Sequence, residues 1–151
     1  MQKICSVDIE DLKKISWKYK IGGKNGKGRE YIFNTKTLIF EGEYLNGIKN
    51  GKGKEYYDNG KIRFEGKYIN GERNGKGKEY NYGKLEFEGE YLNGKRNGKG
   101  KEYDFFGHLK FEGEYLNGKR WNGKVYNKDN ILKSEIKMEM EKGKNMIFLV
   151  I

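Results

Sequence analysis

The sequence has no proline and no alanine, and its 151 residues include one cysteine and one histidine. The single cysteine, Cys5, excludes an internal disulfide and fits a reducing compartment. Neither Cys5 nor His108 has neighbours at the spacing of a metal site, and no strand is followed by the Gly-Lys-Ser/Thr of a phosphate loop. We therefore expect no catalytic activity, no cofactor and no bound metal.

Long apolar runs are also absent. The longest, residues 146–151, is far shorter than the roughly 20 residues needed to span a bilayer, and the N-terminus lacks the apolar segment of a signal peptide. We expect a cytoplasmic protein, with attachment to the periphery of a membrane as an alternative. A hydrophobic content of 34% and a net charge of +10 would favour disorder. However, the aromatic residues recur at fixed positions, which indicates a thin, repeated core.

The chain is organised around a repeat of 23 or 24 residues. The tripeptide Phe-Glu-Gly begins at Phe40, Phe64, Phe87 and Phe111. A second motif, Asn-Gly-Lys-Gly, follows in each copy, and its last, distorted version begins at Asn122. We divide the chain into an N-terminal segment (1–14), which could form a short helix, a repeat array (15–144, full copies 38–130) and an apolar C-terminal strand or tail (145–151).

Each copy has the pattern of a β-hairpin. From Leu85 to Tyr91, apolar residues or glycine alternate with glutamate, which predicts a strand with one apolar and one charged face. Asn93-Gly94 and Asn97-Gly98 are strong turn signals, and 99–103 would be the returning strand. A second turn near 104–107 would lead into the next copy.

Pairing Glu90 with Lys99 gives one possible register for this hairpin. Tyr91 would then face Gly98, Gly89 would face Gly100, and the Glu–Lys pairs would lie on the opposite face from the rings. The glycines would leave room for neighbouring rings. At the two ends of the array, Trp17 and Ile136 occupy the glycine position, and we interpret them as caps.

The motif Phe-Glu-Gly-Glu-Tyr-x-Asn-Gly-x-x-Asn-Gly-Lys-Gly-Lys-Glu-Tyr resembles the MORN repeat, closely over residues 38–126. It also resembles a second type of MORN repeat from bacterial antitoxin-like proteins. The chain departs from the usual pattern by having tyrosine where tryptophan is common, at Tyr44, Tyr68, Tyr91 and Tyr115. The resemblance implies an all-β fold, an elongated single-layer antiparallel sheet of stacked hairpins, and a role in attachment to proteins or anionic lipid.

The repeated aromatic and glycine residues are predicted to form a structural stripe. An open aromatic face that grips a partner is the alternative, because a single-layer sheet has no second layer to cover it. The stripe consists of Phe40, Gly42, Tyr44, Phe64, Gly66, Tyr68, Phe87, Gly89, Tyr91, Phe111, Gly113 and Tyr115.

Basic residues recur next to the first Asn-Gly of each copy, and we expect them to line one edge of the sheet. Such a row could bind anionic lipid, or it could simply keep the sheet soluble. Because glutamates alternate with the lysines, nucleic acid is an unlikely partner. The candidate anion-binding residues are Lys49, Arg73, Lys95, Arg96, Lys119 and Arg120.

Taken together, the sequence predicts a non-catalytic scaffold that binds a protein partner. Two alternatives remain open: recruitment to anionic phospholipid through the basic turn tips, and an antitoxin-like protein that neutralises its partner. A homodimer could form through the sheet face or through the C-terminal edge.

Overall fold

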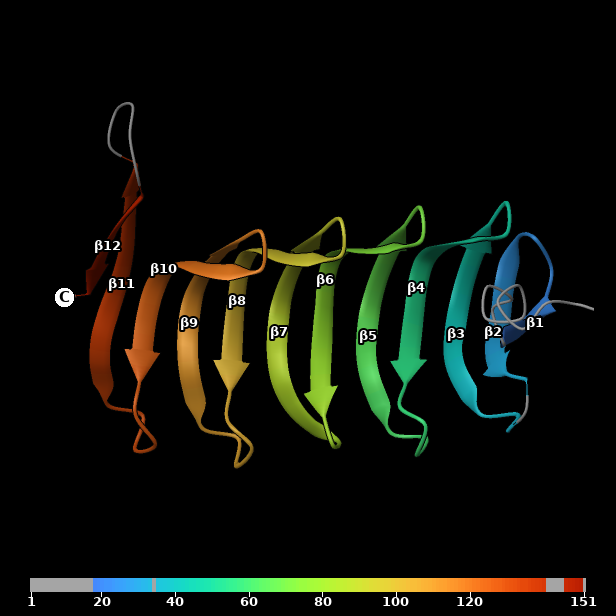
Figure 1. Cartoon of the computed structure of the whole chain (residues 1–151), viewed down its shortest axis with the longest axis horizontal. Coiled ribbons are helices and arrows are strands. Elements are labelled where there is room, and N and C mark those ends of the chain that lie inside the picture. The colour runs from blue at the N-terminus through green and yellow to red at the C-terminus, as the bar shows by residue number, and fades with distance from the viewer. Residues whose placement is uncertain (1–17, 34, 141–145, 151) are drawn as a thin grey trace, which may run out of the picture.

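The computed structural model describes residues 18–33, 35–140 and 146–150, with side chains described up to residue 137. These residues form one 12-stranded antiparallel sheet, in which the strands follow one another in chain order (Figure 1). The predicted all-β, single-layer fold of stacked hairpins is confirmed. The N-terminal segment 1–14 and the predicted cap Trp17 lie outside the described residues.

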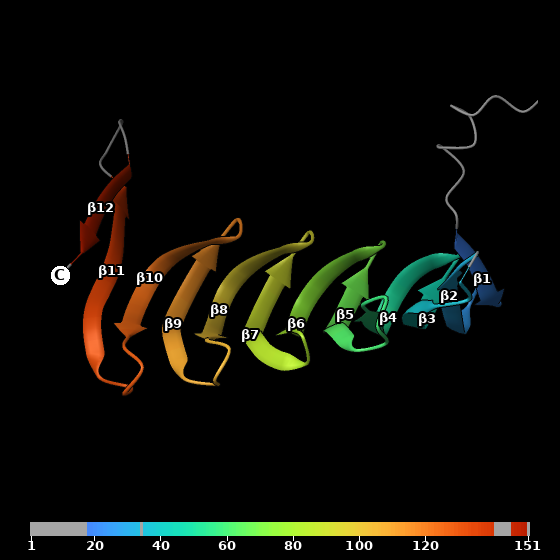
Figure 2. The same ribbon diagram turned by 60° about the horizontal axis from the view of Figure 1, so that its bottom comes forward.

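The strands are short, and consecutive hairpins lie side by side along one axis (Figure 2). Their bounds are β1 Lys18–Gly22, β2 Gly26–Ile32, β3 Leu38–Leu45, β4 Ile48–Tyr56, β5 Ile62–Ile69, β6 Glu72–Asn81, β7 Lys84–Leu92, β8 Lys95–Tyr103, β9 Leu109–Leu116, β10 Lys119–Tyr126, β11 Leu132–Met140 and β12 Met146–Val150.

The two Asn-Gly pairs of each copy have different structures. Asn93 and Gly94 both have positive φ (49° and 78°) and form the tight turn between β7 and β8, as predicted. Asn97-Gly98 is not a turn. It lies inside β8 as a β-bulge, with Gly98 at φ 94° and a register shift opposite Glu90.

Because of this bulge, the pairing between β7 and β8 differs from the predicted register at Tyr91. Gly89 pairs with Gly100, as expected, but Tyr91 faces Arg96 across its own hairpin and not Gly98. The glycine that faces Tyr91 is Gly75, from the preceding hairpin. Each tyrosine therefore packs on the copy before it, which joins successive hairpins into one array.

The aromatic stripe is the core of the protein. The four phenylalanines are at most 1% exposed and the four tyrosines at most 4%. Phe64 meets Tyr68 of its own copy and Tyr91 of the next in T-shaped, edge-to-face contacts, with ring centroids 5.7 and 5.2 Å apart. The open aromatic face, the alternative considered above, is wrong because these rings are covered.

At the C-terminal end, Ile136 faces Gly123 and belongs to the buried core at 8% exposure. The sheet does not end there, because β12 pairs with β11 (Figure 2). Residues 146–150 of the apolar tail form this strand.

Candidate functional site

The aromatic face of the sheet is closed by a layer of charged side chains. A cation lies over the ring of each core phenylalanine: Lys49 Nζ is 3.9 Å from the Phe40 centroid, and Arg73 Cζ is 4.0 Å from that of Phe64. Arg96 and Arg120 repeat this arrangement over Phe87 and Phe111. The rings are thus held between glycine backbone below and a cation above, which explains how a single layer buries its core.

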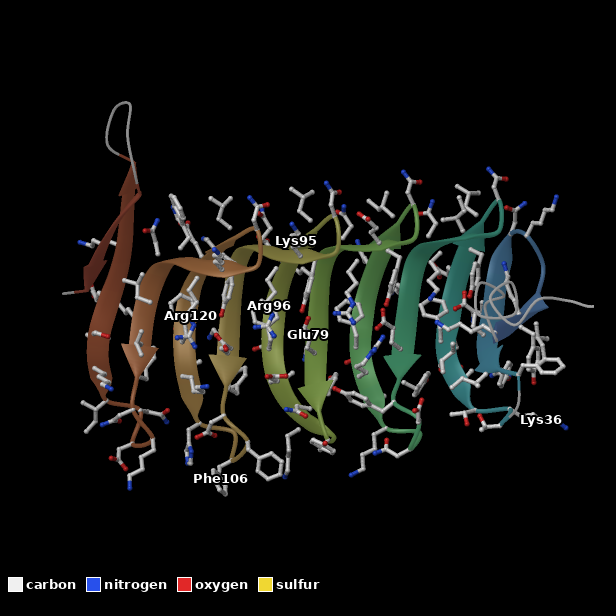
Figure 3. All side chains as sticks on the ribbon, in the orientation of Figure 1. Lys36, Glu79, Lys95, Arg96, Phe106 and Arg120 are labelled. Atoms are coloured by element: carbon white, nitrogen blue, oxygen red, sulfur yellow. The ribbon has the colours of Figure 1, made fainter. Side chains whose placement is uncertain are left out.

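The arginines are joined by carboxylates into a continuous Arg–Glu ladder. Arg73 binds Glu55 at 2.6 Å and Glu79 at 3.0 Å, and Arg96 binds the other oxygen of Glu79. Figure 3 shows Glu79, Arg96 and Arg120 over the middle of the strands. The ladder consists of Glu55, Arg73, Glu79, Arg96, Glu102 and Arg120.

Hydroxyl groups of the core attach the ladder to the rings beneath. Tyr68 donates to Glu55 at 2.6 Å. Burial alone would raise the pKa of Glu55, but hydrogen bonds from Arg73 and Tyr68 and the charge of Arg73 outweigh burial and lower this pKa to about 2. Burial, and then the bonded carboxylate, raise the pKa of Tyr68. Glu55 is therefore a firmly ionised structural group.

Tyr91 departs from this pattern. Its hydroxyl is buried and has no hydrogen bond of good geometry to any described residue, although it lies beside Glu79. In the ladder, one oxygen of Glu79 accepts from Arg73 and the other from Arg96.

The structure separates the six predicted anion-binding residues into two groups. Lys95 and Lys119 are exposed beside the turns, as expected for an edge row (Figure 3 labels Lys95). The other four do not lie on that edge. They fold over the aromatic face and are paired with glutamates; they are Lys49, Arg73, Arg96 and Arg120.

The edge that carries the Asn-Gly turns also exposes a row of aliphatic side chains. Each one precedes an Asn-Gly turn and is between 42% and 51% exposed; they are Leu45, Ile69, Leu92 and Leu116. Each turn is tied to the preceding hairpin, as when Gly94 N donates to Arg73 O at 3.0 Å. We call this surface, together with Lys95 and Lys119, the turn edge.

A long open groove of about 1440 Å³ runs along the opposite, charged face, from Ile21 to Glu114. Glycine backbone forms its floor, and the side-chain positions of these glycines point towards the rings on the other face, where a Cβ at Gly53 would strike Phe40. Lysines and glutamates stand on both sides of this floor in two parallel rows.

One of these rows is electrically balanced, and we call it the neutral row. Opposite charges pair from strand to strand: Lys101 binds Glu112 at 3.2 Å and Lys78 binds Glu88 at 3.6 Å. Tyr103 also donates to Glu88, at 2.8 Å. The row consists of Arg29, Glu41, Lys54, Glu65, Lys78, Glu88, Lys101 and Glu112.

The other row is the basic row: Lys27, Glu43, Lys52, Lys67, Lys76, Glu90, Lys99 and Glu114. Two of its glutamates cap the bulges. Glu43 accepts the backbone N–H of Lys52 at 2.9 Å, and Glu90 accepts that of Lys99 at 3.1 Å. None of its five lysines has an ion pair with any described residue.

These surfaces can bind but show no catalytic arrangement. The described residues include no cluster of acidic, histidine or cysteine side chains that could hold a metal. His108 bonds Asp104 at 2.9 Å within a turn that Asp104 also caps through two backbone amides. Within the described ranges, no helix could cross a membrane.

Sequence reasoning missed both the Arg–Glu ladder and the groove. A signal for the ladder was present: Arg73 and Arg96 each precede a glutamate by six residues, an even spacing that favours one face of a strand. A signal for the groove was the Lys-Gly-Lys motif opposite Glu-Gly-Glu, because alternation along the strands places the charged side chains of both motifs on one face.

Comparison with known proteins agrees with this geometry. The family model of the MORN repeat matches four segments of the chain, residues 40–62, 64–82, 87–104 and 111–121. A search among curated proteins found no match.

Proposed function

Since the chain belongs to the MORN-repeat family, whose repeats are typically non-catalytic and generally associated with protein or membrane binding, we propose that it is a scaffold that binds a protein partner in its groove. The ladder covers the aromatic face, so its rings are buried by contacts within the chain and are not accessible to a partner. The groove is open along most of the array. An antitoxin-like neutraliser of a partner would be one form of this function.

The single observation that carries the proposal is the unpaired basic row along the groove. Lysines that have no ion-pair partner among the described residues favour an acidic protein surface, and complementary charge gives such contacts specificity and speed. The long floor between the two rows suits an extended partner segment.

Affinity capture with charge-matched variants tests this function. Lys52→Glu/Lys76→Glu reverses two charges in the groove, whereas Lys95→Glu/Lys119→Glu reverses two on the turn edge. A partner protein retained by the wild type and the edge variant, but lost by the groove variant, would support the proposal. Equal loss in both variants, or loss in the edge variant alone, would contradict it.

The turn edge favours a second candidate function, attachment to an anionic membrane. Exposed Leu92 and Leu116 lie next to Lys95 and Lys119, so that aliphatic side chains could enter the lipid interface while lysines meet the headgroups. Co-sedimentation with anionic and neutral vesicles at low and high salt tests this. Binding to anionic vesicles that is lost in Lys95→Glu/Lys119→Glu and kept in Lys52→Glu/Lys76→Glu would favour the membrane.

Arg96 and Arg120 are unsuitable for such tests. Both belong to the ladder that covers the core, so reversing their charge would unfold the sheet and abolish any binding.

A further inference from the structure

One position of the basic row breaks the rule that the other copies follow. Glutamate stands at Glu43, Glu90 and Glu114, but the second full copy has Lys67 at the equivalent place. The protein thus lacks a carboxylate that its neighbouring copies use.

The missing carboxylate leaves a backbone amide without its usual acceptor. In the first and third copies, Glu43 and Glu90 accept the bulge amides of Lys52 and Lys99. The equivalent amide in the second copy belongs to Lys76. Lys67 lies across from it, with its Cδ 3.6 Å from the Cβ position of Gly75, and an ammonium group has no lone pair to offer.

The substitution also places like charges together. Lys52 and Lys67 are direct partners across β4 and β5, an arrangement that destabilises a sheet. Lys76 lies next to them along the same row, and all three side chains are exposed without an ion pair to any described residue. Like charges that face each other at a cost in stability, as Lys52 and Lys67 do, are typical of functional sites.

We infer that Lys52, Lys67 and Lys76 form a subsite for a carboxylate of the partner protein, an aspartate or glutamate side chain that takes the place of the glutamate missing from the basic row at position 67. The Lys76 N–H donates to one carboxylate oxygen, as the Lys52 N–H does to Glu43. The three ammonium groups neutralise its charge. This inference rests on the proposed function and names the chemistry of the partner at one point of the groove.

A carboxylate fits the site better than a phosphate for a structural reason. The other copies show the same bulge with a carboxylate already in place, at 2.9 and 3.1 Å from the amide nitrogen. The subsite therefore has a template within the same chain.

NMR titration of the full chain tests the subsite directly. The probe is a peptide of alternating glutamate and serine, and its matched control has glutamine in place of glutamate. We expect the Lys76 amide resonance to move downfield and saturate with the glutamate peptide, and to stay in place with the glutamine peptide. A Lys76 amide that does not respond to the glutamate peptide overturns the inference.

Charge-matched variants separate the subsite from general attraction. Lys67→Glu restores the carboxylate that the first and third copies have in the basic row, so its Lys76 amide should begin at the downfield position and the peptide affinity should fall by about tenfold or more. Lys95→Glu carries the same charge change at the turn edge and should weaken binding by less than about twofold. Equal weakening in the two variants overturns the inference.

Two further readouts complete the design. Glu90→Lys should create a second subsite, visible as a new response of the Lys99 amide to the glutamate peptide; its absence argues against the template. Inorganic phosphate or anionic vesicles that move the Lys76 amide more strongly than the peptide would overturn the assignment to a protein carboxylate.

The outcomes also distinguish this inference from the proposed function. A partner that is captured by the wild type and equally by Lys67→Glu, but lost by Lys52→Glu/Lys76→Glu, leaves groove binding standing and removes the Lys67 subsite. If only Lys95→Glu/Lys119→Glu loses the partner, the proposed function is contradicted, even when the glutamate peptide binds at the subsite.

Discussion

The guanidinium carbon of Arg96 lies 4.2 Å from the centre of the Phe87 ring. Below the same ring lie the backbones of Gly89 and Gly100. This three-level arrangement recurs in each full copy and replaces the second layer that a sheet normally needs to bury one face.

The first prediction concerns the ring itself. Phe87 is fully buried, so Phe87→Ala should reduce the free energy of unfolding by about 3–5 kcal/mol, through lost burial and the cavity left between copies. Phe106→Ala is the matched control, because Phe106 is 82% exposed at the opposite edge (Figure 3), and its effect should be within about 0.5 kcal/mol. Denaturant unfolding followed by circular dichroism measures both. Similar losses in the two variants would contradict the described core.

The second concerns the glycine beneath the ring. A methyl group at Gly100 would lie 2.6 Å from Phe87 Cζ, so Gly100→Ala should cost about 1–3 kcal/mol through overpacking. The same change in a Phe87→Ala background should cost clearly less, because the ring that it strikes is gone. A double-mutant cycle measures this coupling, and additive costs would show that the ring and the glycine do not interact.

The third concerns the choice of cation over the ring. Among the described residues, Lys49 forms an ion pair with Glu30 alone, at 3.0 Å, whereas Arg73 bridges Glu55 and Glu79. Arginine can make paired hydrogen bonds that lysine cannot, so Lys49→Arg should stabilise the protein by about 0.5–1 kcal/mol. Arg96→Lys should destabilise it by a similar amount. Thermal unfolding of both variants should show shifts of opposite sign; shifts of the same sign would argue against the ladder.

The fourth concerns pH. The pKa of Glu55 is lowered from 4.5 to about 2 in the folded chain. Its ionised form therefore stabilises the fold above about pH 4.5, by roughly 3 kcal/mol, and this contribution is lost as the pH falls towards 2. Unfolding measured across this range should show a steeper loss of stability in the wild type than in Glu55→Gln. The control Glu72→Gln changes an exposed residue at the start of β6 and should keep the wild-type slope.

Much of the fold could be predicted from the sequence because its signals are local. Alternation of period two from Leu85 to Tyr91, and the Asn93-Gly94 turn, are both read within a few residues. The second Asn-Gly pair was misinterpreted as a turn because the same dipeptide suits a β-bulge, where glycine also takes positive φ. Only the pairing with neighbouring strands distinguishes the two.

The binding surface could be predicted less well because it depends on the faces of the strands. Lys95 and Arg96 are adjacent in the sequence, yet one is exposed beside the turn and the other covers Phe87. Their shared charge suggested a shared role, whereas alternation along the strand assigns them to different surfaces. The sequence shows lysine at position 67 where other copies have glutamate. Only the structure shows that this glutamate accepts a bulge amide in the first copy, as Glu43 does from Lys52.

Site-specific photo-cross-linking tests the central claim, that the groove is the surface that meets the partner, most directly. A photoreactive residue would replace Lys99, which is exposed in the groove, or Leu92, which is exposed on the turn edge. Neither residue belongs to the buried core or the ladder. We predict a protein adduct from position 99 that acidic peptide suppresses, and none from position 92. An adduct from position 92 alone, or cross-linking to lipid from that position, would contradict the account.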